Sequence, residues 1–459
     1  MHRLTALVIS LALLVGLFVY APQSVRALDP VYIGPGGGSG ECGSPSYETD
    51  GSADNVQFQT AVNDQDSDID NILYVCPGTY DIEDYIAVDG DLTIESVAGA
   101  AATVLDSDGT SRILDLNGDS IIRGLTFKDG DADGGHGGAI LSDSSDDLTV
   151  EDSVFVNNQG YDGGAIYADD GVINIRRSTF TGNSADDEGG AIMFWYDLDL
   201  VLDSTFTNNH AEYDGGAIYV DDDILDDNGD GESGLIGNTF SGNTADNAGG
   251  AVYVDEDLEA SSVISGNTFS NNKAGLNNEN NGEGGGLHID EWLGGTITNN
   301  RFLNNEADYG GGLYSEDLTG TAVITMNTFR SNVATADGGG IWLDDNGYDS
   351  SELAIFTKNS FRGNRASDNG GALYLSFTNT EVGPSFFTRN MYRGNRAALG
   401  GAIAFKGFGS EGAGDCSAPL RSSRIAVRIF KKDRFVSNRA TRSRRTANVG
   451  LMACEADLR

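Results

Sequence analysis

Basic residues are scarce in this sequence. Lys and Arg together number 28 against 70 Asp and Glu, which gives the 459-residue chain a formal net charge of −42. Such a surface repels phosphate groups, so we expect no nucleic-acid partner, whereas cations and neutral or cationic surfaces remain possible partners. Strong charge alone can produce disorder, but 39% of the residues are apolar and provide material for a continuous core.

Cysteine is nearly absent. The four cysteines form one pair near the start, Cys42 and Cys76, and one pair near the end, Cys416 and Cys454. Neither a CxxC spacing nor a histidine cluster accompanies them, so a cysteine-based metal site is not expected. A disulfide within each pair would staple the two ends of the domain, which suits an exported protein.

Long apolar runs are missing after the N-terminus. Arg3 precedes the apolar run from Leu4 to Tyr20, and Val25 to Ala27 has the small-residue pattern that a signal peptidase accepts. We therefore predict a signal peptide over residues 1–27, with an uncleaved membrane anchor as the alternative. The mature protein is expected to be secreted or held at the cell surface, with association to an outer membrane as one possibility.

Self-similarity is the strongest signal in the chain. The unit Gly-Gly-Ala/Gly-Ile/Leu/Val recurs ten times at intervals of 26 to 35 residues, and a Phe-x-x-Asn unit runs in step with it. In nine of the ten Phe-x-x-Asn units the second residue after Asn is Ala. The glycine units begin at Gly137, Gly163, Gly189, Gly215, Gly249, Gly284, Gly310, Gly338, Gly370 and Gly400. The aromatic positions are Phe155, Phe180, Phe206, Phe240, Phe269, Phe302, Phe329, Phe361, Tyr392 and Phe435.

This period predicts an all-β solenoid, a right-handed parallel β-helix with an N-terminal cap. A repeat of 20 to 50 residues indicates a solenoid or propeller. Gly pairs, Asn and β-branched residues in every repeat exclude a solenoid of paired helices. A propeller blade needs roughly 40 residues, which is more than the shortest repeats of 26 residues provide. Coils stacked ~4.8 Å apart place equivalent residues above one another, so Phe forms a core column and Asn bonds to the coils on either side. We expect about three strands per coil.

Four regions follow from this interpretation. Residues 1–27 are the signal peptide, 28–104 the N-terminal cap and first coils, 105–408 the body, and 409–459 a last coil with a basic C-terminal cap. An amphipathic helix over residues 55–65 would cover the open end of the core. The basic end has three alternatives to a simple cap: attraction to the acidic flank of another molecule, attachment to an anionic surface, or a departure from the ancestral reading frame.

The tandem pairing of GGAI with FxxN over roughly residues 120–440 resembles the repeats of the polymorphic outer-membrane proteins of chlamydiae. The segments from Val31 to Cys42, Ile72 to Val97 and Ile121 to Ile140 also look like exported right-handed β-helix proteins. The resemblance implies a β-helix at the cell surface, adhesin-like in some members. The chlamydial proteins end in a membrane β-barrel, whereas no alternating strand series of that length follows Phe408, so no integral barrel is expected in this chain.

Two acidic loops are candidates for calcium. Asp226, Asn228 and Asp230 precede Gly231 in a D-x-N-x-D-G pattern, and a D-x-D-x-D-G pattern is formed by Asp129, Asp131 and Asp133. Oxygen ligands at alternate positions can converge on a hard cation. Neither loop has Glu at its twelfth position, and solvated loop acids are the alternative. Calcium is the one cofactor that the sequence suggests.

One column of aromatic residues directly follows the aliphatic residue of the glycine unit. If the aliphatic side chain points inward, strand alternation turns this column outward, beside stripes of Asp. An exposed strip of this kind would bind a glycan or a surface protein of a host or neighbouring cell, and mutual stacking that stiffens the wall is the alternative. The strip comprises Tyr167, Tyr219, Tyr253, Tyr314, Trp342 and Tyr374, with Met193 and His288 in the same column.

No catalytic residue emerges from the sequence. Carboxylates are so abundant that a pair at hydrolase spacing is uninformative, and His136, His210 and His288 are interpreted as loop or turn residues. We therefore predict an exported β-helix that serves as an adhesin-like binding and structural module. A polysaccharide lyase or glycoside hydrolase on the same scaffold is the alternative. An active site would break the uniform repeat at one place, which separates the two hypotheses.

Overall fold

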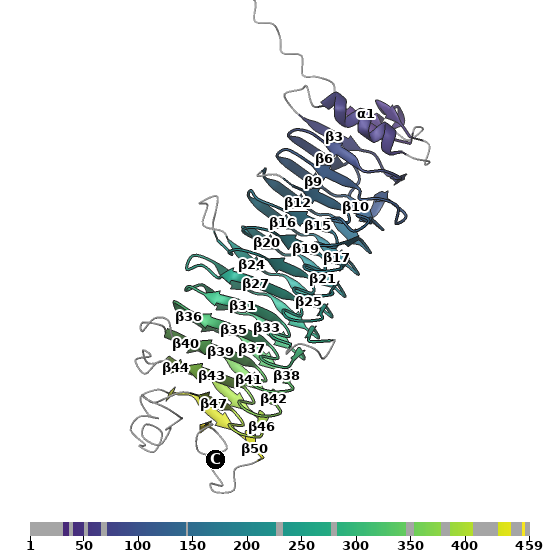
Figure 1. Cartoon of the computed structure of the whole chain (residues 1–459). Helices are drawn as coiled ribbons and strands as arrows, with labels where there is room; N and C mark the ends of the chain where they lie inside the picture. Colours follow the sequence, from purple (N-terminus) through teal and green to yellow (C-terminus); the bar gives the residue numbers. More distant parts are fainter. Residues whose placement is uncertain are drawn as a thin grey trace, which may run out of the picture. The chain divides into compact units, whose positions relative to one another are not determined.

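The computed structural model describes residues 31–35, 40–49, 54–65, 71–143, 146–225, 233–276, 282–345, 353–377, 386–406, 430–441 and 452–454. The predicted signal peptide, residues 1–27, lies outside these ranges. The described residues belong to one compact unit, Val31–Arg459, and its regular structure is almost entirely parallel β-strand. Each turn of the chain adds one strand to each of three sheets, and from β14 onward also one to a fourth sheet. Successive coils therefore lie one after another, as the series β3, β6, β9 and β12 shows (Figure 1).

The first sheet buries alternate aliphatic side chains. In β12, for example, Leu148 and Val150 face the core and Thr149 lies outside it. The sheet consists of β2 (Tyr47–Glu48), β1 (Val31–Gly34), β3 (Ile72–Val75), β6 (Leu92–Ser96), β9 (Ser120–Arg123), β12 (Leu148–Glu151), β16 (Ile173–Arg176), β20 (Leu200–Leu202), β24 (Gly234–Ile236), β28 (Val263–Ser265), β32 (Thr296–Thr298), β36 (Thr321–Thr325), β40 (Leu353–Thr357), β44 (Phe386–Thr388) and β48 (Phe430–Lys431).

The phenylalanine sheet carries the predicted aromatic column. Phe127 pairs with Phe155 and Phe155 with Phe180, and the same register holds to Phe435. The sheet consists of β4 (Gly78–Asp81), β7 (Thr103–Asp106), β10 (Thr126–Lys128), β13 (Val154–Val156), β17 (Thr179–Thr181), β21 (Thr205–Thr207), β25 (Thr239–Ser241), β29 (Thr268–Ser270), β33 (Arg301–Leu303), β37 (Thr328–Arg330), β41 (Ser360–Arg362), β45 (Met391–Arg393) and β49 (Arg434–Val436).

The glycine-unit sheet follows the Gly-Gly pairs. Gly189 has φ +65°, and a Cβ on Gly190 would lie 2.4 Å from the carbonyl oxygen of Gly216 in the next coil, so both positions require glycine. The sheet consists of β5 (Ile86–Val88), β8 (Leu114–Leu116), β11 (Ile140–Ser142), β15 (Ile166–Ala168), β19 (Ile192–Phe194), β23 (Ile218–Val220), β27 (Val252–Asp257), β31 (Leu287–Trp292), β35 (Leu313–Leu318), β39 (Ile341–Asp345), β43 (Leu373–Phe377), β47 (Ile403–Lys406) and β51 (Met452–Cys454).

A fourth sheet corrects the expectation of three strands per coil. Its two-residue strands follow the repeat Asn, and their buried Ala packs against the Ala of the next coil, as at Ala334 and Ala366. Strands this short give almost no alternation signal in the sequence. The short-strand sheet consists of β14 (Gln159–Gly160), β18 (Ser184–Ala185), β22 (His210–Ala211), β26 (Thr244–Ala245), β30 (Lys273–Ala274), β34 (Glu306–Ala307), β38 (Val333–Ala334), β42 (Arg365–Ala366), β46 (Arg396–Ala397) and β50 (Arg439–Ala440).

Two asparagine ladders provide hydrogen bonds to the polar groups of the buried turns. In the predicted one, Asn209 Nδ2 donates to Asn243 Oδ1 at 3.0 Å and to the carbonyl of Phe180 at 3.2 Å. The second was not anticipated and lies two residues before the aromatic position, where Asn267 Nδ2 donates to Asn300 Oδ1 at 3.0 Å. A buried amide in every coil needs such partners, because an unpaired polar group there costs about 1–3 kcal/mol.

The N-terminal helix α1 (Asn55–Gln65) packs on β1, β2, β3 and β5. Two short 3₁₀ helices also belong to this end of the chain: η1 (Gly40–Gly43) contacts β1, and η2 (Ala100–Ala102) contacts β7. Phe58 is fully buried and meets Tyr80 edge to face at 5.2 Å. Gln59 exchanges two hydrogen bonds with the backbone of Ala87 in β5, so its amide replaces a neighbouring strand at that edge. That the helix acts as a cap for the domain stays a prediction.

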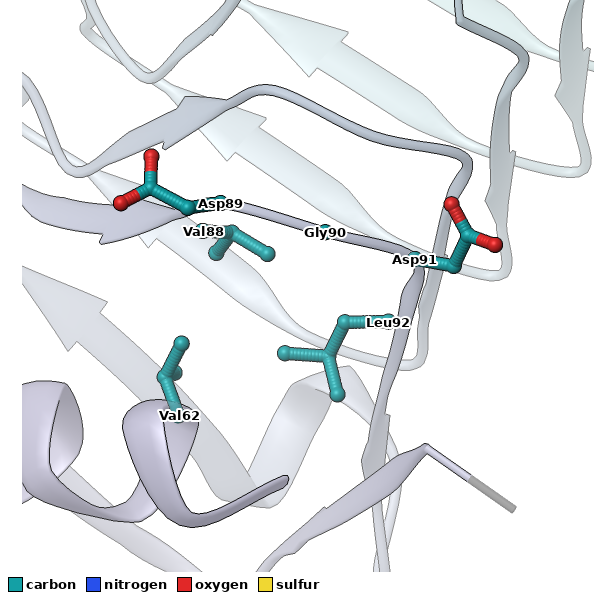
Figure 2. Close-up of a pocket in the computed structure, with 6 residues that line it drawn as sticks. All are labelled: Val62, Val88, Asp89, Gly90, Asp91 and Leu92. Atoms are coloured by element: carbon teal, nitrogen blue, oxygen red, sulfur yellow. The ribbon is translucent and has the colours of Figure 1, made fainter. Parts of the chain in front are cut away.

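Two further features lie beside this helix. Cys42 and Cys76 form a disulfide with a Cα–Cα distance of 5.7 Å. A small pocket between Val62 and the turn Asp89–Gly90–Asp91 has room for about one water molecule (Figure 2). Cys416 lies outside the described residues and only the backbone of Cys454 is described, so their pairing stays a prediction. No helix in the described ranges is long and apolar enough to cross a membrane.

Candidate functional site

The predicted aromatic column forms the outer wall of the glycine-unit sheet. Tyr167 pairs with Met193 and Met193 with Tyr219, one strand to the next, and their side chains form a cluster separate from the main core. Strand alternation produces this placement, because Ile166 and Ile192 point into the core. We call this column the aromatic ladder; its members are Tyr167, Met193, Tyr219, Tyr253, His288, Tyr314, Trp342 and Tyr374.

The expectation that this ladder is exposed is wrong. Its tyrosines, Met193 and His288 are all buried, and Trp342 is half-buried. Ring faces cover one another: Tyr219 and Tyr253 stack at 5.2 Å, and Tyr314 and Trp342 at 4.4 Å. Rings that stack in this way have no free face for a sugar, so the ladder itself stiffens the wall. Whether the outer face binds a ligand is a separate question, decided by the residues on either side.

One side of the ladder is a row of residues that immediately precede the glycine pairs. The amide of Gly163 donates to the carbonyl of Glu188, and that of Gly189 to Asp214, so these residues align coil by coil. Tyr161, Asp187 and Tyr213 stand one residue earlier and align in the same way. We call this row the glycine-side rim; it comprises Tyr161, Asp162, Asp187, Glu188, Tyr213, Asp214 and Glu283.

The other side is a row that stands two residues after each ladder position. The amide of Trp195 donates to the carbonyl of Ala168, and that of Asp221 to Phe194, each in the preceding coil. Tyr219 donates to Asp221 at 3.4 Å, and Tyr253 to Asp290 at 3.3 Å, so the ladder hydroxyls reach this row. We call it the strand-end rim; it comprises Asp169, Trp195, Asp221, Asp255 and Asp290.

Carboxylates on the two rims influence one another. Burial, together with the negative charges of Asp187, Asp162, Asp214 and Asp221, raises the pKa of Glu188 to about 8. Burial likewise raises the pKa of Asp214 to about 7 and that of Asp221 to about 6. Because Glu188 and Asp221 belong to opposite rims, negative charge is concentrated across the ladder as well as along it.

The repeat is broken in the coil that contains β19. Met193 replaces a ring in the ladder, and Trp195 replaces an acid in the strand-end rim. Trp195 and Tyr196 are 41% and 43% exposed, and on the other rim Tyr161 and Tyr213 are 43% and 44% exposed. The Trp195 ring lies 6.4 Å from that of Tyr167. These four rings were not predicted from the sequence, although the WY dipeptide after Phe194 interrupts the acidic row and marks the place.

His288 also departs from the expectation of a loop or turn residue. It lies in β31 between Tyr253 and Tyr314, with centroids at 4.4 and 4.7 Å, and it is 1% exposed. Burial lowers its pKa, but the hydrogen bond to Asp290 at 2.7 Å and the charges of Asp290 and Glu283 outweigh burial and raise it. A side chain this buried cannot contact a polymer. His288 therefore compensates the negative charge of Asp290 and Glu283 inside the wall.

The candidate calcium ligands do not form a site in the described residues. Asp129 contacts Lys128 at 2.7 Å and accepts a hydrogen bond from Asn157 at 3.2 Å, while Asp131 Oδ1 accepts one from the amide of Asp133 at 2.8 Å. Within the described ranges, no three His, Cys, Asp or Glu side chains gather closely enough to hold a metal ion. Asp226, Asn228 and Asp230 lie outside those ranges, so calcium stays a prediction.

The stacked coils, the internal ladders and the in-register parallel pairing define a parallel β-helix. Two overlapping segments, residues 112–291 and 203–387, match the family model described as a right-handed β-helix region. Together they cover more than half of the chain, and the protein belongs to the right-handed β-helix family. No curated protein and no solved structure gave a significant match.

Proposed function

We propose that the protein is an exported, adhesin-like binding and structural module that displays a rigid β-helix outside the cell. The phenylalanine column and the predicted asparagine ladder support the structural part, because both continue in register along the described body. The N-terminal sequence, residues 1–27, supports export as a signal peptide, and N-terminal sequencing of the secreted protein would test its removal. The resemblance to polymorphic outer-membrane protein repeats supports surface display. The glycan or surface protein that it binds meets the outer face of the glycine-unit sheet.

One observation carries the binding part. Four exposed aromatic rings fall within three adjacent coils, beside carboxylates on both rims, at the place between Tyr167 and Tyr374 where a ladder ring and the acid two residues after it are both replaced. Exposed rings beside fixed polar groups are typical of surfaces that recognise sugars or protein side chains. We call this surface the Trp195 face; it comprises Tyr161, Asp187, Glu188, Trp195, Tyr196 and Tyr213.

A glycan array with the mature protein tests this proposal. We expect a defined set of glycans to bind, and we expect Trp195→Ala combined with Tyr213→Ala to abolish that binding. Tyr85→Ala is the matched control, since Tyr85 is 48% exposed on the N-terminal coils and lies away from this surface. Equal loss in the control, or retained binding in the double variant, would place the ligand elsewhere.

Glycoside hydrolysis is the second candidate, favoured by the acids at the same break. Glycoside hydrolases pair a protonated carboxyl with an ionised carboxylate. The pKa is about 8 for Glu188 and about 6 for Asp221, so at pH 7 Glu188 would be the protonated group and Asp221 the ionised one. Release of reducing sugar from glycans that bind the protein distinguishes the two functions. Activity that Glu188→Gln removes without weakening binding would establish the enzyme.

A further inference from the structure

We propose that the Trp195 face selects an amine-bearing pyranose chain, such as a β-1,4-linked glucosamine oligomer, aligned with the direction in which the coils stack. This inference rests on the proposed glycan binding and specifies the class of glycan. It depends on three features of the surface: its charge, its spacing and its rings.

The negative charge of the Trp195 face disfavours the binding of acidic glycans. Asp169, Asp187 and Asp221 stand in three consecutive coils beside the exposed rings, on one rim or the other. The ring of His136 lies 5.9 Å from that of Tyr161, and its Nδ1 is already paired with the Asp162 carboxylate at 2.9 Å. Within residues 161–223 the basic residues are Arg176, Arg177 and His210, and they belong to other parts of the coil, at β16 and β22. Arg177 is already paired with Asp152 at 2.9 Å. A uronate polymer would therefore be repelled, whereas ammonium groups would gain charge-assisted hydrogen bonds.

Spacing favours a sugar chain over a peptide. Rim residues recur once per coil, at the strand separation of ~4.8 Å. A β-1,4-linked pyranose chain advances by a similar distance per ring, so successive rings could meet successive coils, with the amine directed to alternate sides from one ring to the next. An extended peptide places side chains on the same side only every second residue, roughly 6.6 Å apart, and would lose register after a few coils.

The rings provide the remaining contacts. Trp195 and Tyr196 stand on the strand-end side and Tyr161 and Tyr213 on the glycine side, all between 41% and 44% exposed. Pyranose C–H faces pack on aromatic rings, and an ammonium group above an exposed Trp or Tyr ring gains a cation–π contact. Asp187 lies between Tyr161 and Tyr213 on the glycine-side rim, so an amine beside either ring meets a carboxylate.

Isothermal titration calorimetry with the mature chain tests the inference. The three ligands are the hexamers of glucosamine, of N-acetylglucosamine and of lysine, each measured at pH 6 and low salt. We expect the glucosamine hexamer to bind at least about tenfold more tightly than its N-acetylated counterpart, because the two differ in the charge of each amine. Added salt is expected to weaken the glucosamine complex selectively. Trp195→Ala and Asp187→Asn should each reduce its affinity about tenfold or more, and Asp84→Asn with Tyr85→Ala should leave it unchanged.

Each contrary outcome has a separate meaning. Equal binding of the two sugars would overturn selection by charge and leave glycan binding intact. Binding of the lysine hexamer alone would overturn the inference and indicate a cationic protein partner. Binding that survives both Trp195→Ala and Asp187→Asn would remove the site. Absence of binding to all three probes would overturn the inference, and a glycan array without any hit would in addition overturn the proposed function.

Discussion

Phe180 and Phe206 stack face to face, with ring centroids 4.8 Å apart and an angle of 4° between the rings. They are 26 residues apart in the sequence, which is one coil. The same geometry continues along the phenylalanine sheet, so both faces of an interior ring are covered by the rings of adjacent coils. Stability therefore rests on contacts between neighbouring coils, as in other solenoids.

Removal of one ring should open a cavity that the rigid coils cannot close. Phe206→Ala should lower the free energy of unfolding by about 3–5 kcal/mol, because Phe206 is fully buried between Phe180 and Phe240. Chemical denaturation followed by circular dichroism measures the change. Thr207→Ala, one residue later and pointing out of the core, should change stability by less than about 0.5 kcal/mol. Equal losses of stability in the two variants would contradict the conclusion that the stacked Phe rings stabilise the fold.

The asparagine ladder should not tolerate an acid. In Asn243→Asp the buried amide that donates to Asn272 Oδ1 and to the carbonyl of Phe206, both at 3.1 Å, becomes a carboxyl. We expect a loss of at least about 3 kcal/mol at neutral pH, and a smaller loss at pH 4, because a protonated carboxyl is cheaper to bury. Asn271→Asp is the matched control at an exposed turn. A pH-independent loss would show that charge is not the cause.

Glu188 should make stability fall as pH rises. Its ordinary pKa is 4.5 and its folded pKa is about 8, so the folded state holds a proton that the unfolded state has released in between. The free energy of unfolding should therefore decrease from about pH 4.5 to about pH 8, and Glu188→Gln should flatten the curve in that window. Denaturation at pH 5 and pH 8 compares the two proteins. A wild-type curve that rises over this window, or a variant with the same slope, would contradict the assignment.

Helix α1 should protect the first coils. Phe58→Ala removes a buried ring that meets Tyr80, and we expect a loss of about 3–5 kcal/mol in the stability of this end. Hydrogen exchange should then increase in β1, β3 and β5 before it increases in later strands, because solenoids can open from one end. Val56→Ala alters an exposed residue of the same helix and is the control. Uniform exchange along the whole chain would argue against a cap.

Calcium binding predicts a response to chelation. If Asp226, Asn228 and Asp230 hold the ion, millimolar calcium should raise the melting temperature of metal-free protein, and Asp226→Asn with Asp230→Asn should remove the increase. Asp129→Asn with Asp131→Asn examines the second loop in the same way. Magnesium at equal concentration controls for screening of the net charge of −42. Equal stabilisation by the two ions would leave screening as the explanation.

Much of the fold was predictable because its determinants recur at a fixed sequence position. The Phe column, the first Asn ladder, the buried Ala and the glycine pairs all follow from equivalent places in successive coils. The second Asn ladder was missed because Ser153, Ser178 and Ser204 occupy its early positions, so the pattern becomes uniform only from Asn238. The exposed rings of the proposed Trp195 face border the sheet that carries the predicted aromatic column, but they are not the rings of that column.

The amino-acid sequence alone determined the period, the in-register stacking and the acidic character of the outer face, because each depends on which residues recur and at what interval. Tertiary structure alone decided which aromatic side chains meet solvent. Tyr219 lies in β23 and Trp195 directly follows β19 of the same sheet, yet the first is 4% and the second 41% exposed. Neighbouring rings and the adjoining rim cover Tyr219, whereas Trp195 stands on the rim itself, and that difference arises from packing between coils.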